Sequence, residues 1–420
     1  MKRIVSFAVL MLLMIIAIAP VAAQECDDAI GCVEIGPDDP ITIAYMLTTS
    51  GATSFLGEDS VGGIELAVLE RDETLLGRDI EVVGEDSLCS AEGGQTAAQR
   101  VAADEEILGV IGTSCSSAGT AALPIISEAG MLMISPTNTA PALTDDGENG
   151  TWLPGYYRTA HNDLFQGRVA AEFVYNELGK VALATIHDGS PYADGLQAVM
   201  ADVFGELGGE VVFQGAVNIG DTDMTAILTE IASQEPDVIY LPIFEPESNF
   251  VVAQSASIPG LEGVTLITAD ASQVASFPGN TGAAALGMYL SGPYVDVSNE
   301  AYADFLAMWD EEIGGVPPAG FHAHAYDATN MLLDAIEAVA VELEDGSILV
   351  GRQALRDALS ATEGFEGLTG TLSCGPTGDC ATGEALAIFQ ITQAEIDGNW
   401  PPPVVYLPGI GMVEMMEESE

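Results

Sequence analysis

The chain alternates short apolar runs with longer segments of helical periodicity, and this alternation restricts its fold more than any other feature. Residues 108–111 and 131–134 are apolar runs of strand length, and the segment between them is long enough for a helix. This pattern predicts a βαβ unit, and its repetition predicts an α/β fold of parallel sheets with helices on both faces. We expect further strands at 41–47, 80–84, 180–186, 210–214, 237–242, 265–269 and 287–292. We expect helices at 59–71, 92–104, 163–178, 193–207, 224–234, 247–257, 300–312 and 323–344.

Small hydroxyl residues follow both strands of the 108–134 unit. Ser116 comes shortly after the first strand, and Thr137 and Thr139 follow the second. In an open parallel sheet, ligands bind beyond the carboxyl ends of the strands, where backbone N–H groups and helix N-termini are available. These loops therefore suit a small carboxylate.

The first 23 residues have the pattern of a secretory signal peptide. Lys2 and Arg3 precede an apolar run, and Val21-Ala22-Ala23 supplies small residues before a cleavage point. The alternative is an uncleaved membrane anchor, because the run approaches the length that spans a bilayer. We expect an exported protein in the periplasm or at the outer face of the cell membrane.

The charge balance excludes some classes of partner. The chain has 10 Lys and Arg residues against 64 Asp and Glu residues, which gives a formal net charge of −54 at pH 7. Nucleic acid and anionic membrane surfaces would repel such a protein. A high-salt habitat and an acidic medium are two explanations for this acidity, because salt screens carboxylates and acid protonates them.

The cysteines form three close pairs along the sequence. These pairs are Cys26 with Cys32, Cys89 with Cys115, and Cys374 with Cys380. An even number of cysteines in an exported chain predicts disulfides, although six cysteines permit fifteen connectivities. Zinc binding is the alternative, but the chain has no C-x-x-C spacing.

The length and composition predict two domains with cores of their own, because about 397 residues remain after cleavage of 1–23 and 48% of the chain is hydrophobic. Residues 24–40 form an acidic lead-in with a small Cys loop, and residues 411–420 form an acidic tail.

Short fragments along the chain carry a resemblance through their order and spacing. These fragments are Ser50-Gly51, Phe55-Leu56-Gly57, Cys89 with Cys115, Ile134-Ser135-Pro136, Ala140-Pro141-Ala142-Leu143-Thr144, Arg158-Thr159, Ile186-His187-Asp188, Tyr192-Ala193-Asp194-Gly195, Gly220-Asp221-Thr222-Asp223 and Pro236-Asp237-Val238-Ile239-Tyr240. From about residue 41 to 406 the chain resembles the solute-binding proteins of branched-chain amino acid ABC transporters, the Leu/Ile/Val-binding family of type I periplasmic binding proteins.

The resemblance implies two Rossmann-like lobes with a ligand cleft between them, joined by three hinge crossings near 158–160, 287–293 and 368–373. The first lobe would then contain residues 41–158 and 292–368. The second would contain residues 159–291 and 369–410. Cleft closure about the crossings is the expected motion.

The resemblance also implies roles for particular residues. Ser116 takes the position of a carboxylate-binding serine, and Thr137 and Thr139 align with positions that supply a backbone group and a threonine hydroxyl. Asp270 occupies an acidic position that completes the ammonium site, although glutamate is common there. Tyr192 and Phe244 fall at aromatic closing positions, where Phe244 replaces the usual tyrosine. Leu56 and Phe321 border the side-chain pocket.

Each of these residues also has an ordinary structural interpretation. Ser116 can cap a helix, Thr137 and Thr139 can belong to a Ser-Pro turn, and Asp270 can be a solvated acid at a strand end. Core packing alone would explain the four apolar and aromatic residues.

The sequence predicts a solute receptor rather than an enzyme. No set of nucleophile, base and orienting acid is evident, and we expect no cofactor. His322 and His324 are two residues apart, but no third metal ligand accompanies them, so we expect no metal. The expected partners are a small amino acid and an ABC permease, with a monomeric binding protein. The alternatives are an amide, urea, a small organic acid, or a sensory role.

Overall fold

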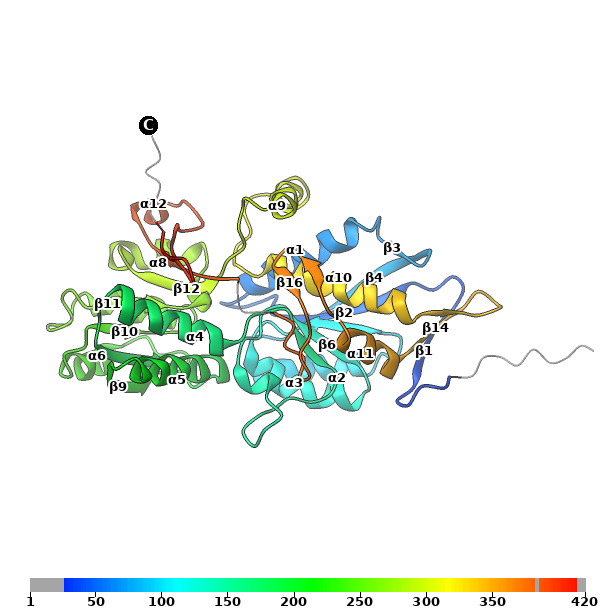
Figure 1. Ribbon diagram of the computed structural model, residues 1–420, viewed down its shortest axis with the longest axis horizontal. Helices are drawn as coiled ribbons and strands as arrows, with labels where there is room; N and C mark the ends of the chain where they lie inside the picture. Colours follow the sequence, from blue (N-terminus) through cyan, green and yellow to red (C-terminus); the bar gives the residue numbers. More distant parts are fainter. Residues whose placement is uncertain (1–25, 382–384, 414–420) are drawn as a thin grey trace, which may run out of the picture.

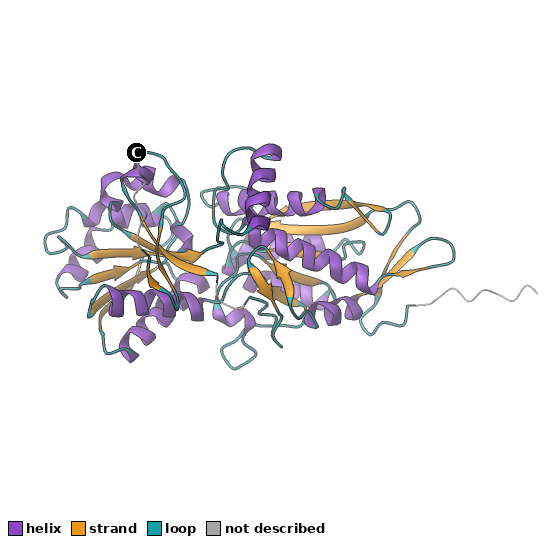
Figure 2. Cartoon of the chain, turned by 45° about the horizontal axis from the view of Figure 1, so that its top comes forward, coloured by secondary structure: helices purple, strands orange, loops and turns teal. Residues whose placement is uncertain are grey.

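The computed structural model describes residues 26–381 and 385–413 of the chain. Two large sheets, each covered by helices, lie in separate halves of an elongated molecule (Figure 1). The expected signal peptide at 1–23 and most of the acidic tail lie outside the described residues. The α/β fold class is confirmed, with helices flanking the strands of both sheets (Figure 2).

The first sheet has six strands in the order β3-β4-β2-β5-β6-β7, and all neighbours are parallel except β3 with β4. Every residue of β5 and β6 is buried, which explains why these strands are continuous apolar runs rather than alternating ones. The strands are β2 (Ile41–Leu47), β3 (Thr74–Leu75), β4 (Arg78–Asp86), β5 (Gly109–Gly112), β6 (Leu132–Ser135) and β7 (Tyr156–Arg158).

Helices pack on both faces of the first sheet. One face carries α2 (Ala91–Ala102) and α3 (Ser116–Glu128), whose small residues Ala97, Ala98 and Ala122 join the core there. The other face carries α1 (Phe55–Leu69), α10 (His322–Val339) and α11 (Arg352–Ser360). Helix α9 (Glu300–Glu312) packs against α1 through Tyr302, Phe305 and Trp309.

The second sheet has eight strands in the order β19-β18-β17-β12-β11-β10-β8-β9, parallel from β12 to β9 and antiparallel from β12 to β19. The strands are β8 (Ala182–His187), β9 (Glu210–Ala216), β10 (Val238–Tyr240), β11 (Thr265–Thr268), β12 (Tyr289–Pro293), β17 (Leu386–Gln390), β18 (Val404–Leu407) and β19 (Gly411–Met412). Its helices are α4 (Asp163–Glu172), α5 (Pro191–Glu206), α6 (Thr225–Ala232), α7 (Glu247–Ser255), α8 (Ser276–Thr281) and α12 (Gln393–Ile396).

Some elements differ from the sequence-based expectations. The helix expected at 163–178 changes to a π-helical turn at Phe173–Glu177. The helix expected at 323–344 ends at Val339, because β13 (Val341–Glu342) pairs with β14 (Ile348–Gly351). The lead-in contributes β1 (Cys32–Ile35), which also pairs with β14. A small hairpin of β15 (Phe365–Gly367) and β16 (Gly370–Leu372) was not expected.

The boundaries of the two lobes remain a proposal. Strand β12 lies wholly in the second sheet, so we propose that the chain passes to the first lobe after Pro293. Leu372 and Cys380 pack in the core of the first sheet, whereas Leu386 begins β17 of the second. We therefore propose that residues up to Cys380 belong to the first lobe, so that the last passage comes later than the sequence suggested.

The three cysteine pairs form disulfides as predicted. Cys26 bonds to Cys32, Cys89 to Cys115, and Cys374 to Cys380.

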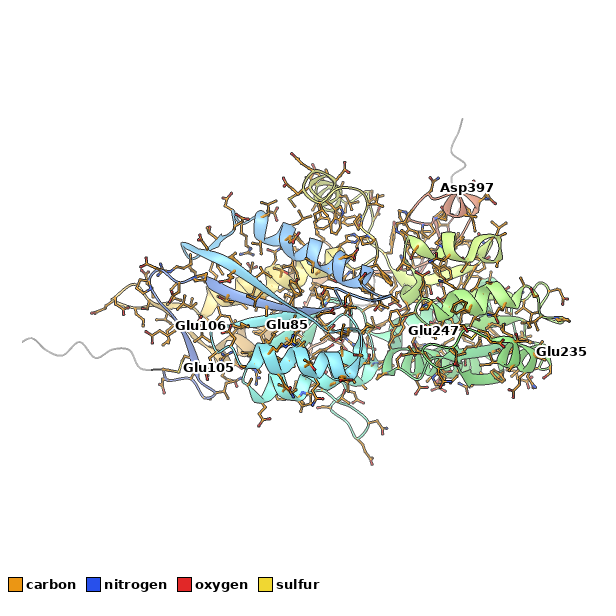
Figure 3. All side chains as sticks on the ribbon, turned by 180° about the vertical axis from the view of Figure 1, so that it is seen from behind. Glu85, Glu105, Glu106, Glu235, Glu247 and Asp397 are labelled. Carbon is orange, nitrogen blue, oxygen red and sulfur yellow. A yellow bond between two sulfur atoms is a disulfide. The ribbon has the colours of Figure 1, made fainter. Side chains whose placement is uncertain are left out.

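Within the described residues, no helix combines the length and the apolar character needed to cross a membrane. Acidic side chains spread over both halves of the surface, including Glu85 and Glu105 on one and Glu235 and Asp397 on the other (Figure 3).

A buried arginine ties the chain together where the two halves meet. Arg158 is fully buried and pairs with Asp379, and its guanidinium also donates to the carbonyl of Ala140 at 2.9 Å and to the hydroxyl of Thr144 at 2.7 Å. Asp379 accepts further hydrogen bonds from Thr144 at 2.8 Å and from Asn162 at 3.0 Å. The pair therefore connects the loop after β6, the start of α4 and the Cys374–Cys380 loop.

Loss of the Asp379 charge should destabilise the fold. We expect Asp379→Asn to lower the free energy of unfolding by about 3 kcal/mol, because it leaves the Arg158 cation buried without its anion. Denaturant unfolding of wild type and variant measures the difference. Glu85→Gln is the matched control: Glu85 pairs with Arg100, whose side chain is 66% exposed, so its loss should cost under about 1 kcal/mol. Equal effects of the two variants would contradict this role of the buried pair.

Candidate functional site

A pocket between the two halves collects seven of the eight predicted ligand residues. It is lined by Ser114 and Cys115 together with the predicted Leu56, Ser116, Thr137, Tyr192, Phe244, Asp270 and Phe321. Leu56, Ser116, Thr137 and Phe321 come from elements around the first sheet. In the second half, Tyr192 lies at the start of α5, whereas Phe244 and Asp270 lie in the loops that follow β10 and β11.

The first-sheet wall of the pocket presents neutral polar groups. Ser116 is the first residue of α3, so the pocket borders a helix N-terminus with backbone N–H groups that lack partners within the helix. The Ser116 hydroxyl accepts a hydrogen bond from the N–H of Ala140 at 3.3 Å. Thr137 uses its hydroxyl to donate to the carbonyls of Thr113 at 3.0 Å and Ser114 at 2.8 Å. This wall can accommodate an anion without a permanent cation.

Contacts between strand-end loops hold this wall in place. The Cys89–Cys115 disulfide joins the loop after β4 to the start of α3, directly beside Ser116. Thr48, which follows β2, donates its N–H to the Ser114 hydroxyl at 2.9 Å and accepts from the N–H of Cys89 at 3.0 Å. Three neighbouring parallel strands thus end in one connected loop cluster.

The second-sheet wall carries a buried carboxylate. Asp270 follows β11 and is 5% exposed. One of its oxygens accepts from the amide of Gln166 at 2.7 Å and from the hydroxyl of Tyr192 at 2.8 Å. Gln166 in turn lies 2.5 Å from His161 through its carbonyl oxygen. These contacts leave the other oxygen of Asp270 available to a ligand.

Apolar and aromatic side chains close the remaining sides. The rings of Tyr192 and Phe244 are tilted against each other with centroids 5.3 Å apart. Leu56 and Phe321, from the first half, pack in the same core cluster as Tyr192 of the second half. The halves are therefore in contact across the pocket, and the cavity is only about 10 Å³, roughly the space of one water molecule. A larger ligand can enter only when these walls move apart.

The sequence of this chain matches a known family model over most of its length. Residues 40–396 match the model described as "Periplasmic binding protein". The chain belongs to this family.

Individual relatives agree with this assignment. The Leu/Ile/Val-binding protein BraC3 of Rhizobium johnstonii is 27% identical over 355 residues, which cover 83% of this chain and 91% of BraC3. The crystal structure of the leucine-binding protein LivK from Thermotoga maritima has a TM-score of 0.75 at 26% identity and covers 88% of this chain and 99% of LivK. A solute-binding protein from R. palustris, crystallised with benzoate, has a TM-score of 0.73 at 20% identity, covering 89% of this chain and 96% of that protein.

The periplasmic binding protein assignment confirms two predictions. The resemblance to branched-chain amino acid binding proteins is confirmed, and so is the type I fold. The family and fold are those of solute-binding proteins rather than enzymes.

The eighth predicted residue of this binding protein, Thr139, is not among the residues that line the pocket. Thr139 is fully buried, and its carbonyl accepts from the N–H of Asp163 at 3.0 Å. The Asp163 carboxyl is fully buried, and neither of its oxygens has a hydrogen-bond partner among the described residues. Burial raises the pKa of Asp163 well above its usual value, and the neighbouring Asp270 charge adds to the rise.

Sequence reasoning missed Asp163 and Gln166 as neighbours of the site. They lie three residues apart at the start of α4, directly after the loop that follows β7, so both side chains face the same way. That spacing was the available signal. Ser114 and Cys115 were missed as lining residues, although both adjoin Ser116 in the sequence.

The environment of Asp270 makes its proton affinity unusual. Burial raises the pKa of the Asp270 carboxyl to about 6, and the hydrogen bonds from Gln166 and Tyr192 offset that rise only in part. A nearby ligand cation would favour the ionised form and lower this pKa again.

This raised pKa predicts a pH-dependent contribution to stability. Between about pH 4 and pH 6 the folded protein holds a proton on Asp270 that the unfolded chain has released, so this group's contribution falls as pH rises through that window. Asp270→Asn lacks this group, so its stability relative to wild type should rise by about 2–3 kcal/mol from pH 4 to pH 7. Denaturant unfolding at both pH values measures it. A constant difference between the two proteins would contradict the raised pKa.

Proposed function

We propose that this protein binds a small amino acid, of the branched-chain type, between its two lobes and delivers it to an ABC permease. The observation that carries the proposal is the opposition of two unlike walls in one pocket. Ser116 and the N-terminus of α3 lie on one side, and the Asp270 carboxylate lies on the other. Such a pair of walls matches the two charges of a zwitterion.

The proposed roles follow from the chemistry of each wall. A ligand carboxylate would accept hydrogen bonds from the Ser116 hydroxyl and from backbone N–H groups at the start of α3. The ligand ammonium would donate to Asp270, whose second oxygen is not used by Gln166 or Tyr192. Leu56, Phe244 and Phe321 would surround an apolar side chain. In this proposal Thr137 stabilises the loop after β6 through its hydrogen bonds to Thr113 and Ser114. Thr139 contributes only indirectly, through its contact with Asp163.

Binding and lobe closure would be coupled. The carboxylate contacts come from the first lobe and the ammonium contact from the second, so a zwitterion gains both only when the lobes are closed. A ligand that binds one state better shifts the population toward that state. The closed form would then be the one presented to the permease. The proposed location of the mature protein, after export, is the periplasm or the outer face of the cell membrane.

A small aromatic acid is the second candidate ligand. The R. palustris relative was crystallised with benzoate, and this pocket has three aromatic walls, Tyr192, Phe244 and Phe321. An acid without an ammonium group gives the Asp270 carboxylate no counter-charge, which disfavours such a ligand because the hydrogen bonds from Gln166 and Tyr192 offset only part of the cost of burying that charge. Amides, urea and a sensory role have no specific observation in their favour.

A ligand screen separates the two candidates. Leucine, isoleucine or valine at a hundred times the dissociation constant should add about 2.7 kcal/mol to the free energy of unfolding, which a thermal-shift assay detects. Benzoate should add less at equal concentration. The assay should be run at high and low salt because of the net charge of −54. Stabilisation by benzoate alone would replace the amino acid proposal with the aromatic acid.

Removal of the Asp270 charge should weaken amino acid binding selectively. We expect Asp270→Asn to reduce leucine affinity at pH 7 by at least about thirtyfold in isothermal titration calorimetry, because the buried ammonium loses its counter-charge. Wild-type affinity should also fall below about pH 6, where Asp270 becomes protonated. Asp397→Asn, an exposed acid at the end of α12, is the matched control and should bind normally. Full leucine affinity in Asp270→Asn would remove Asp270 from the site.

A further inference from the structure

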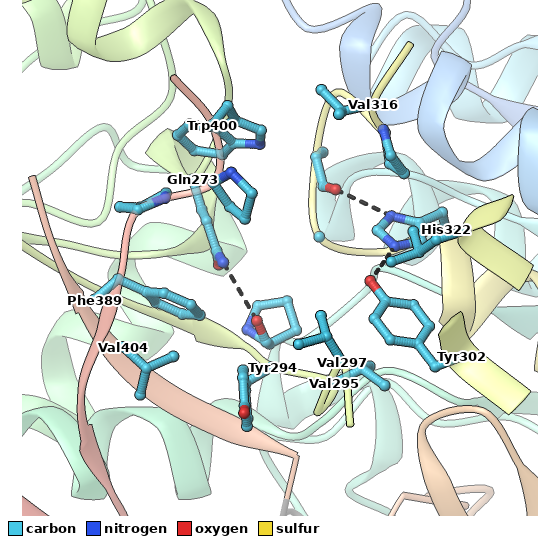
Figure 4. Close-up of a pocket in the computed structure, with 17 residues that line it drawn as sticks. Gln273, Tyr294, Val295, Val297, Tyr302, Val316, His322, Phe389, Trp400 and Val404 are labelled. Atoms are coloured by element: carbon cyan, nitrogen blue, oxygen red, sulfur yellow. Dashed lines mark hydrogen bonds between the residues drawn. The ribbon is translucent and has the colours of Figure 1, made fainter. Parts of the chain in front are cut away.

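A second cavity lies beside the proposed amino acid pocket and is much larger. Its volume is about 210 Å³, against about 10 Å³ for the pocket at Asp270. Figure 4 shows Phe389, Val404 and Trp400 on one side and Tyr302, His322 and Val316 on the other. The cavity therefore lies between the second sheet and the α9 region of the first lobe.

The lining of this cavity offers no free charge. His322 is the histidine in the cavity lining, and both of its ring nitrogens already have partners within the protein. Its Nδ1 lies 3.1 Å from Asp59 and from the carbonyl of Ala319, and its Nε2 lies 2.8 Å from the Tyr302 hydroxyl. Gln273 donates its amide to the carbonyl of Pro293 at 3.3 Å. The side-chain carbonyl oxygen of Gln273 is buried without a hydrogen-bond partner among the described residues, but most of the lining is apolar or aromatic, so a ligand here gains chiefly from apolar contact.

Size and charge narrow the ligand class. Apolar protein cavities of about 150 Å³ hold a benzene-sized molecule, so 210 Å³ is sufficient for one substituted ring. No Lys or Arg lines the cavity, and the chain carries a net charge of −54, which disfavours an anion. Aromatic walls from Tyr294, Tyr302, Phe389 and Trp400 favour stacked or edge-on contact with a planar ring.

The cavity and the amino acid pocket share two walls. Asp59 accepts from the N–H groups of Ala319 at 3.0 Å and Phe321 at 2.8 Å and so fixes the loop between them. Phe321 lines the amino acid pocket, whereas Ala319 lines the cavity. The turn after β11 also borders both spaces, because Asp270 lines the pocket and Gln273 lines the cavity.

We propose that this cavity binds a small neutral aromatic molecule. The cavity exists in the lobe arrangement where Leu56 and Phe321 pack with the second lobe. This proposal goes beyond the amino acid function and does not depend on it.

Fluorobenzene is the probe, and ¹⁹F NMR of the full protein measures its binding. Two valines line opposite sides of the cavity, namely Val316, which is 60% exposed, and Val404. The larger side chains of Val316→Trp and Val404→Phe should fill the cavity. We expect at least one of these variants, shown to be folded by circular dichroism, to weaken fluorobenzene binding about tenfold or more. Val181→Trp, at an exposed valine away from the cavity, is the matched control and should bind as wild type. Unchanged binding in both filled variants would overturn the proposal.

Two further measurements separate this site from the amino acid pocket. Ser116→Ala should keep fluorobenzene affinity within about twofold. A loss of fluorobenzene affinity in this variant would place the ring in the amino acid pocket and overturn the proposal. Binding of tetramethylammonium but not fluorobenzene would also refute the proposal, because the cavity would then select a cation and not a neutral ring. If leucine fails to bind while fluorobenzene binding still responds to the filled variants, the cavity assignment stands and the amino acid function fails.

Discussion

The buried pairing of Arg158 with Asp379 is the interaction on which the arrangement of the two halves depends. One guanidinium, with no exposed surface, joins three stretches of chain that are far apart in sequence. A cation in such a position is stable only when an anion and carbonyl oxygens surround it, so all three stretches must be in place together. The backbone reinforces this, because the N–H of Arg158 donates to the carbonyl of Gly378 at 2.9 Å and its carbonyl accepts from the N–H of Cys380 at 3.1 Å.

The polar wall of the pocket is a consequence of that arrangement. Arg158 holds the carbonyls of Asn138 and Ala140, and the N–H of Ala140 reaches the Ser116 hydroxyl. The loop after β6 is therefore held by Arg158 and meets the start of α3 at Ser116. These contacts within the protein hold the polar wall in place, and a wall that is ordered before binding reduces the ordering cost of binding.

The opposite wall is organised by a chain of polar contacts within the second lobe. His161, Gln166 and Asp270 are linked in series, and Gln166 also donates to the carbonyl of Ser291 at 3.0 Å. Burial lowers the pKa of His161 to about 4, so this ring is neutral near pH 7 and adds no positive charge. Asp270 is left as the ionisable group facing the pocket, and the pKa of the neighbouring Asp163 is raised well above its usual value by burial and by the Asp270 charge. The two walls thus differ in charge, because the first-lobe wall consists of neutral hydroxyl and backbone groups and the second-lobe wall contains the Asp270 carboxyl.

The sequence by itself determined the α/β class, the three cysteine pairs and nine of the nineteen strands among the described residues, which include every parallel strand except β7. The strands and the hydroxyl residues Ser116 and Thr137 follow from local patterns, because apolar runs of strand length and hydroxyl-rich strand ends are visible in short windows. β2 coincides with its expected range, 41–47, for this reason. The resemblance to the Leu/Ile/Val-binding family supplied the other five pocket residues, namely Leu56, Tyr192, Phe244, Asp270 and Phe321. The hairpins β13–β14 and β15–β16 are local in sequence, but their strands of two to four residues are too short for a periodic pattern to be recognised. The tertiary structure alone decided the partner of Arg158, the contact of Thr139 with Asp163 and the large apolar cavity. Each of these three depends on contacts between residues separated by tens to hundreds of positions, and no local pattern encodes such contacts.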